Sequence, residues 1–150
     1  MRLTIFTDYT LRVLIYLGTH KDDARLTTIS DIAGSYGISR NHLMKVVHQL
    51  AKLGYIETTR GKGGGMRLAR APEAINIGEL VRATEDDLAL VECFQSGPPR
   101  CPIVHACTLQ GVLAQSRNAF FDVLDRYTLA DLLHPKAKLV AIFGAANTPQ

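Results

Sequence analysis

Apolar and polar residues in the first part of the chain alternate with the spacing of amphipathic helices. Between residues 4 and 17 the apolar positions share one helical face, and Gly18 is placed to end the helix. The apolar positions are Ile5, Leu11, Leu14, Ile15 and Leu17. This pattern predicts a first helix that turns one face toward a core.

Two further helices are predicted where N-cap residues precede apolar runs. Thr28 is placed to cap a short helix, and Gly37 supplies a turn after it. Ser39 is placed to cap a longer helix that runs through Leu53. The stripe that this longer helix buries consists of Leu43, Val46, Val47 and Leu50. Two helices joined by a glycine-containing turn predict a helix-turn-helix.

A short β-hairpin is predicted directly after these helices. Residues 55–59 and 66–69 are the expected strands, and the glycine-rich segment 60–65 is the tip. Small residues at a hairpin tip let its backbone approach a DNA groove. A nucleotide-binding loop is disfavoured, because the segment lacks a Gly-Lys-Ser/Thr end and a strand follows it instead of a helix. After a helix-turn-helix, such a hairpin is typical of a wing.

The second half of the chain predicts one short and one long helix. Residues 77–84 suggest the short helix, and the long one is expected from about Ile103 to near Arg126. Its apolar positions are Leu109, Val112, Leu113, Ala119, Phe120, Val123 and Leu124. This face exceeds what a small winged domain can cover, which indicates a dimer interface, although packing on the first helix would explain it equally. Thr128 is placed to cap a last short helix over residues 129–133.

We therefore predict a mainly α fold, a winged helix-turn-helix DNA-binding domain with a long C-terminal dimerisation helix and a cysteine-containing cluster loop. The expected units are the winged domain in residues 1–75 and the connecting helix with the loop in 76–108. The dimerisation helix and the last short helix occupy 109–143, and a flexible tail occupies 144–150.

The composition of the chain indicates where in the cell the protein is expected. The 150 residues are 47% hydrophobic and 21% charged, which fits a globular chain and argues against disorder. No apolar run reaches the ~18 uncharged residues of a membrane helix, and the N-terminus lacks a small-residue cleavage site. We expect a cytoplasmic protein that does not enter a membrane.

Positive charge gathers in the predicted winged domain. Residues 1–70 hold eleven Lys and Arg against five Asp and Glu, whereas residues 71–150 hold six against nine. A basic stripe on such a domain indicates contact with double-stranded DNA, although the charges taken alone favour a solvated helix face. The residues assigned to DNA contact are Thr28, Ser39, Arg40, Asn41, His42, Lys45, Arg60, Lys62, Gly63, Gly64 and Arg67. Arg40, Asn41 and His42 are expected at base edges or in the groove. Contacts with the DNA backbone or the minor groove are expected from Lys45, Arg60, Lys62 and Arg67.

All three cysteines of the chain, Cys93, Cys101 and Cys107, fall within fifteen positions. An odd number of thiols in a reducing compartment indicates metal ligation or redox sensing rather than a disulfide framework. Three thiolates nearly complete a ligand set for an iron–sulfur cluster. A structural zinc site that includes His105 and a cluster-free thiol redox regulator are alternatives.

An enzyme is disfavoured by the distribution of candidate catalytic groups. The basic region lacks an evident nucleophile–base pair. Four of the five histidines, His20, His42, His48 and His134, are scattered over different elements, apart from two that share one helix. The sequence therefore favours a regulator over a catalyst.

These features together resemble the family of winged-helix iron–sulfur regulators that contains the cluster-biogenesis regulator IscR and the nitric-oxide sensor NsrR. The resemblance rests on residues 60–65 with the following segment 67–69, and on cysteines separated by seven and then five residues. It spans about residues 1–126. It implies a homodimer that binds an inverted-repeat operator and represses transcription until nitric oxide damages the cluster.

The resemblance also bears on the fourth ligand. Biogenesis-type members place a histidine three residues after the third cysteine, where this chain has Gln110. Asp8 matches the position from which NsrR-type members supply a carboxylate to the cluster of the partner subunit. The resemblance thus implies a [4Fe-4S] cluster, with [2Fe-2S] as the alternative, held by the three cysteines and Asp8 of the partner subunit. The residues alone favour an ion pair of Asp8 with Arg12, one turn on.

Overall fold

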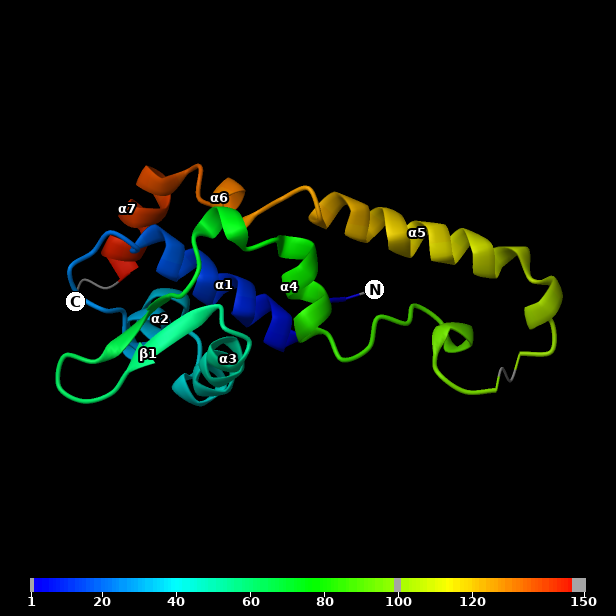
Figure 1. The fold of residues 1–150 in the computed structure, drawn as a ribbon, viewed down its shortest axis with the longest axis horizontal. Helices are drawn as coiled ribbons and strands as arrows, with labels where there is room; N and C mark the ends of the chain where they lie inside the picture. Colours follow the sequence, from blue (N-terminus) through cyan, green and yellow to red (C-terminus); the bar gives the residue numbers. More distant parts are fainter. Residues whose placement is uncertain (1, 99–100, 147–150) are drawn as a thin grey trace.

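A computed structural model describes residues 2–98 and 101–146 of the chain (Figure 1). The helices in the first half are α1 (Ile5–Thr19), α2 (Ile29–Tyr36), α3 (Arg40–Lys52) and α4 (Ile77–Thr84). Those in the second half are α5 (Thr108–Leu124), α6 (Leu129–Leu132) and α7 (Lys136–Ala146). A two-stranded sheet, β1 (Ile56–Thr59) and β2 (Gly65–Leu68), follows α3, and short 3-10 turns lie at Pro72–Ala74, Glu92–Phe94 and Val104–Ala106. The predicted mainly α winged-helix fold is confirmed.

The first helix is longer than the sequence predicted, because Gly18 does not end it. α1 continues to Thr19, and the His20 backbone N–H closes the last turn by donating to the Tyr16 carbonyl. Gly18 is buried, and a Cβ there would lie 2.6 Å from Leu133 Cδ1. Gly18 therefore allows α1 to pack closely against the residue that follows α6, and it does not end the helix.

The helix-turn-helix is built as its caps predict. Thr28 and Asp31 form a reciprocal capping box at the start of α2, and Gly37 takes a left-handed φ of 64° at its end. The Ser39 hydroxyl caps α3. The predicted stripe of α3 is buried, at Leu43, Val46, Val47 and Leu50.

The wing is an antiparallel hairpin in which Glu57 pairs with Arg67 and Thr59 with Gly65. Its first strand begins at Ile56, one residue later than predicted, and Tyr55 is buried. The Met66 N–H donates to the Thr27 carbonyl at 2.7 Å, and the Thr27 N–H donates to the Met66 carbonyl at 3.2 Å. This bridge attaches the hairpin to the residues that lead into α2.

The long helix begins later than predicted and leaves the body of the protein. A 3-10 turn at Val104–Ala106 precedes α5, which starts at Thr108 with Cys107 as its N-cap residue. Figure 1 shows that α5 extends away from α1. The structure describes every residue of α5, and among them only Phe121 is buried. Leu109 and Val112 remain 61% and 52% exposed. Packing on the first helix therefore does not account for this apolar face.

The C-terminal end of α5 is bonded to α4. The Arg82 guanidinium donates to both carboxylate oxygens of Asp125, at 2.6 and 2.7 Å, and lies 4.4 Å from the centre of the Phe121 ring. The hydrogen bond from Arg82 lowers the pKa of Asp125. One end of α5 is thus held by a bidentate ion pair, while the rest of the helix projects.

A final helix, α7, was not predicted from the sequence. It includes Gly144, so the tail expected from that residue is helical through Ala146, and the rest of that tail lies outside the described residues. The segment is apolar on nearly every side, which hides helical periodicity. Phe143 is buried, with its ring centre 4.9 Å from that of Tyr16 and 5.3 Å from that of Tyr36. α7 therefore packs on α1 and α2.

No helix in residues 2–98 and 101–146 is long and apolar enough to cross a membrane.

Candidate nucleic-acid interface and cysteine loop

The N-terminal end of α3 carries the predicted base-reading residues on its exposed side. The Ser39 hydroxyl accepts the His42 N–H at 3.3 Å, so this serine is engaged in capping. The other predicted contacts of this helix, Arg40, Asn41, His42 and Lys45, are all exposed. Their exposure follows from the buried stripe on the opposite face, and it leaves polar and cationic groups free for a DNA groove.

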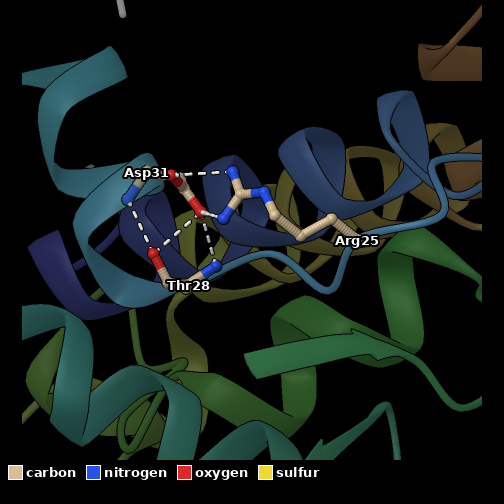
Figure 2. A network of polar contacts seen from close by, with 3 residues as sticks. All are labelled: Arg25, Thr28 and Asp31. Carbon is tan, nitrogen blue, oxygen red and sulfur yellow. Dashed lines mark hydrogen bonds and ion pairs between the residues drawn. The ribbon is translucent and has the colours of Figure 1, made fainter. Parts of the chain in front are cut away.

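At the start of α2, Thr28 is committed to a local network (Figure 2). Its hydroxyl donates to Asp31 Oδ2 at 2.8 Å and accepts the Asp31 N–H at 3.2 Å. The Arg25 guanidinium donates to both oxygens of the same carboxylate at 3.1 Å. Burial raises the pKa of Asp31, but the hydrogen bonds from Arg25 and Thr28 outweigh it and hold that pKa below its ordinary value. Thr28 thus acts as a helix cap, and its DNA contact stays a prediction.

Arg25 is a cation that the sequence prediction missed. Its side chain is 71% exposed although it pairs with Asp31, and it lies at the end of α2 that presents free N–H groups. The signal in the sequence was weak, because Arg25 stands in the polar connection before the helix. It places an exposed guanidinium at the start of α2, with part of its charge compensated by Asp31.

The wing exposes Arg60 and Lys62 at its tip, whereas Arg67 is paired. The Arg67 guanidinium donates to Glu57 Oε2 at 3.1 Å across the hairpin, so part of its charge is compensated. Gly63 is exposed at the tip, and Gly64 cannot carry a side chain, since a Cβ there would lie 2.3 Å from the Thr59 carbonyl oxygen. The tip therefore combines free cations with tightly folded backbone.

Arg70, which lies in the same basic stretch of the sequence, has a structural role. Its guanidinium donates to the carbonyl oxygens of Leu53 and Gly54, both at 2.9 Å, and lies 4.5 Å from the centre of the Tyr55 ring. A cation at these carbonyls caps α3 and complements its dipole. The basic stripe thus divides into structural and accessible charges.

Replacing Lys62 with alanine is expected to weaken DNA binding about equally for every sequence. An exposed lysine at the wing tip suits a phosphate contact, and one lost contact lowers the slope of log affinity against log salt by about 0.9. Fluorescence anisotropy with two unrelated duplexes over a salt series measures this. Arg40→Ala is the comparison, because loss of a base reader changes the preference between duplexes. An unchanged salt slope for Lys62→Ala would contradict the contact.

The three cysteines lie along the segment between α4 and α5. Cys93 is in the 3-10 turn Glu92–Phe94, Cys101 is in an exposed stretch, and Cys107 is the N-cap residue of α5. All three thiols are free, and Cys93 and Cys107 are half-buried. Unpaired thiols suit iron–sulfur or zinc ligation in their chemistry. Across residues 2–98 and 101–146, however, no three His, Cys, Asp or Glu side chains are grouped closely enough to hold a metal ion.

One cavity of about 470 Å³ opens in this loop. Cys93, His105 and Gln110 are among its lining residues, together with Gln95 and Ser96. The structure therefore brings the first cysteine toward the alternative ligand His105, while Cys101 and Cys107 do not line this cavity. The turn that carries Cys93 is held by α5, where the Arg117 guanidinium lies 5.0 Å from the centre of the Phe94 ring.

Asp8 lies on α1, apart from the cysteines of its own chain, and is paired with Arg12. Arg12 Nη2 lies 2.9 Å from Asp8 Oδ2, and Arg12 Nε donates to Oδ1 at 3.1 Å. This is the ion pair expected from the residues alone. Both side chains are nearly half exposed, at 45% for Asp8 and 42% for Arg12. The guanidinium also lies 5.7 Å from the centre of the Tyr36 ring on α2, so the pair connects α1 to the helix-turn-helix.

A helix-turn-helix followed by a basic, glycine-tipped hairpin defines a winged-helix transcriptional regulator that binds DNA. The chain belongs to the Rrf2 family, described as an iron-dependent transcriptional regulator, whose sequence model matches residues 3–135. The predicted resemblance to the regulators that include NsrR is confirmed.

Similar proteins agree with this assignment. The chain is 56% identical to the HTH-type transcriptional regulator NsrR of Bacillus licheniformis over 133 residues, which are 89% of this chain and 92% of that protein. It is 50% identical to NsrR of Bacillus subtilis over 95% of this chain and 97% of the other. These relatives are named transcriptional regulators, which confirms the prediction of a regulator rather than an enzyme.

Solved structures show the same architecture. The global cysteine regulator CymR of B. subtilis superposes with a TM-score of 0.71 at 26% identity, covering 88% of this chain and 95% of the other. T. potens IscR also gives a TM-score of 0.71, at 23% identity over 100% of this chain and 93% of the other. At that identity the likeness to IscR concerns the fold alone.

Proposed function

We propose that the chain is a homodimeric repressor that senses nitric oxide through an iron–sulfur cluster and releases operator DNA when the cluster is nitrosylated or lost. The observation that carries this proposal is the set of three free thiols in one segment, attached to a winged-helix body. The similarity to proteins named NsrR supports the same function. The operator is expected to be an inverted repeat, because a two-fold dimer presents two recognition helices.

In this proposal Cys93, Cys101 and Cys107 hold the cluster, and Asp8 of the partner subunit is the fourth ligand. A [4Fe-4S] cluster is proposed, with [2Fe-2S] as the alternative. A carboxylate is a harder and weaker ligand for iron than a thiolate, so the cluster supplies one iron that nitric oxide can attack. Support for an accessible Asp8 comes from its 45% exposed side chain. The three cysteines lie in one segment between α4 and α5, as a shared cluster requires.

The dimer is proposed to form along α5. Its exposed apolar residues Leu109, Val112 and Val123 have no covering element within the described chain, and Ile103 before the helix is 61% exposed. Burying such a face against a second copy removes apolar area from water. A dimer along α5 also lets the α1 helix of one subunit approach the cysteine segment of the other, as the proposed ligand set requires.

The path from ligand to DNA runs through α1. Asp8 is bonded to Arg12, which lies over Tyr36 at the end of α2, and the ring centre of Tyr9 lies 6.1 Å from that of His42 on α3. When Asp8 is drawn toward the partner's cluster, it must leave Arg12, and the contacts of α1 with both helices change. Such an exchange is a two-state element that alters the placement of the recognition helices.

Replacement of Asp8 by alanine is expected to alter the cluster spectrum and its response to nitric oxide, because one iron loses its carboxylate. Absorbance and circular dichroism of the anaerobic protein, titrated with nitric oxide, measure both. Arg12→Ala is the matched control, since it removes the ion pair and keeps the carboxylate. A spectrum and a titration that stay identical in Asp8→Ala would remove Asp8 from the ligand set. Full operator affinity after nitric oxide in the unaltered protein would contradict the sensing mechanism itself.

A structural zinc site is a second candidate, and the shared cavity of Cys93 and His105 favours it. Zinc binds thiolate and imidazole in tetrahedral sites and gives no visible colour. Metal analysis of anaerobic protein separates the two candidates, because a cluster brings iron and sulfide with visible absorbance. A colourless protein with one zinc per chain, lost in His105→Ala, would establish the zinc site instead.

A further inference from the structure

The N-terminus of α1 is capped by a residue that lies 81 positions further along the chain. The Thr4 N–H donates to Glu85 Oε1 at 2.8 Å, and the Thr4 hydroxyl lies 3.1 Å from the same oxygen. Thr4 is the N-cap residue of α1, and its hydroxyl accepts the Thr7 N–H at 3.2 Å. Together these bonds have the pattern of a capping box, with the carboxylate supplied from outside the helix.

The two other helices that begin with a threonine cap take their capping carboxylate from within the same helix. Thr28 and Thr128 each receive the carboxylate of an aspartate three residues on, Asp31 and Asp131, in a local capping box. At the corresponding place α1 has Thr7, whose hydroxyl donates to Thr84 on α4 at 3.0 Å. The sequence thus lacks the local acid, and Glu85 takes its place. Its negative charge also complements the positive end of the α1 dipole.

Glu85 stands where the cysteine segment begins. Its backbone N–H donates to the Val81 carbonyl and closes α4, and from there the chain leaves toward the loop (Figure 1). On the other side of the bond, Asp8 lies one turn into α1. A cavity of about 430 Å³ at this junction is lined by Thr4 and Thr84 and by Lys45 and His48 of the recognition helix α3. The Glu85 carboxylate therefore joins the start of the cysteine segment to the helix that carries Asp8, and the Thr4 that it contacts lines a cavity shared with α3.

We infer that Glu85 is a positioning residue that couples the conformation of residues 86–98 and 101–107 to the N-terminal turn of α1. When the cysteine segment changes conformation on binding a cluster, the change passes through the Glu85–Thr4 hydrogen bonds and shifts the turn that carries Asp8. The capping role stands on the contacts of the chain itself, and the coupling to cluster state rests on the proposed function. Glu85 acts within one subunit, whereas the proposed Asp8 link acts between subunits.

Hydrogen–deuterium exchange of residues 4–8 in the full-length, metal-free protein tests the cap. Glu85→Ala is expected to exchange about fivefold faster in this turn, the factor that loss of a typical cap gives. Glu85→Gln keeps an oxygen acceptor at the same reach and is expected to stay within about twofold of the unaltered protein. Asp87→Ala is the matched control, because the Asp87 carboxylate accepts the Ala89 N–H two residues on. Exchange in Glu85→Ala equal to the unaltered protein, or equally fast in Asp87→Ala, would overturn the cap.

The same measurement on the cluster-loaded protein tests the coupling. Cluster loading is expected to change the exchange rate of residues 4–8 in the unaltered protein and in Glu85→Gln, but not in Glu85→Ala. An equal change in all three would overturn the coupling. Visible absorbance reports independently whether a cluster is present. A protein that binds no cluster under any condition would contradict the proposed function and with it the coupling, while the metal-free exchange would still decide the cap.

Discussion

Cys107→Ala is expected to abolish the visible absorbance of the anaerobically purified protein and, with it, all response of DNA binding to nitric oxide. The substitution leaves two thiolates, too few to hold an iron–sulfur cluster together with one carboxylate. The fold is expected to persist, because Cys107 precedes α5 without a side-chain capping bond. The free energy of unfolding should fall by less than about 1 kcal/mol, the range of substitutions away from core and network positions.

Anaerobic absorbance, iron and sulfide content, and gel-shift titration with nitric oxide check this result. His105→Ala is the companion variant, because His105 shares a cavity with Cys93 but is not in the proposed ligand set. It should keep the absorbance. A Cys107→Ala protein that retains a normal cluster spectrum, or a His105→Ala protein that loses it, would show that the ligands have been wrongly assigned. Far-UV circular dichroism confirms that each variant is folded.

Gly64→Ala is expected to weaken DNA binding by about thirtyfold near 0.15 M salt through displacement of the wing. A Cβ at this position would meet the Thr59 carbonyl oxygen at 2.3 Å and the Gly61 carbonyl oxygen at 2.9 Å, both in the backbone of the same tip. The tip must therefore open, and Arg60 and Lys62 leave their positions together. Loss of two phosphate contacts lowers the salt slope by about 1.8, which corresponds to that factor at this salt concentration.

The salt slope is measured by anisotropy as for Lys62→Ala, which removes only one of the two contacts. Gly111→Ala is the control for the added methyl group, because nothing lies within 4 Å of a Cβ there. Thermal unfolding of Gly64→Ala should stay cooperative, since the core of α1, α3 and α4 does not include the tip. A salt slope equal to that of the unaltered protein would mean that the tip does not touch the DNA backbone.

Several elements were predictable because their signals are local. Thr28 marks the start of α2 and Ser39 that of α3, and the four-residue stripe of α3 is buried as its spacing requires. The glycine-rich tip predicted a hairpin because a chain reversal between two short β-prone segments needs little else. Gly18 misled the prediction, since a glycine kept for close packing looks the same in sequence as one that ends a helix.

The candidate site was only partly predictable. The cysteines and their spacing are visible in the sequence, and so is the chance of an Asp8–Arg12 pair one helical turn apart. Arg25 was missed because a bidentate bond to Asp31 depends on how the polar connection folds back on α2. α7 was missed because a segment that is apolar on every side shows no periodicity, and its burial depends on Tyr16 and Tyr36.

The sequence by itself determined α1 to α6 to within a few residues, the basic wing and the three thiols, because caps, turns and periodicity act over a few residues of one segment. Only the tertiary structure decided that the apolar face of α5 is uncovered and that the Arg12 guanidinium lies over the Tyr36 ring of α2. It also decided that Glu85 caps a helix 81 residues earlier in the chain. Contacts of this kind depend on the path of the whole backbone, and no local pattern encodes them.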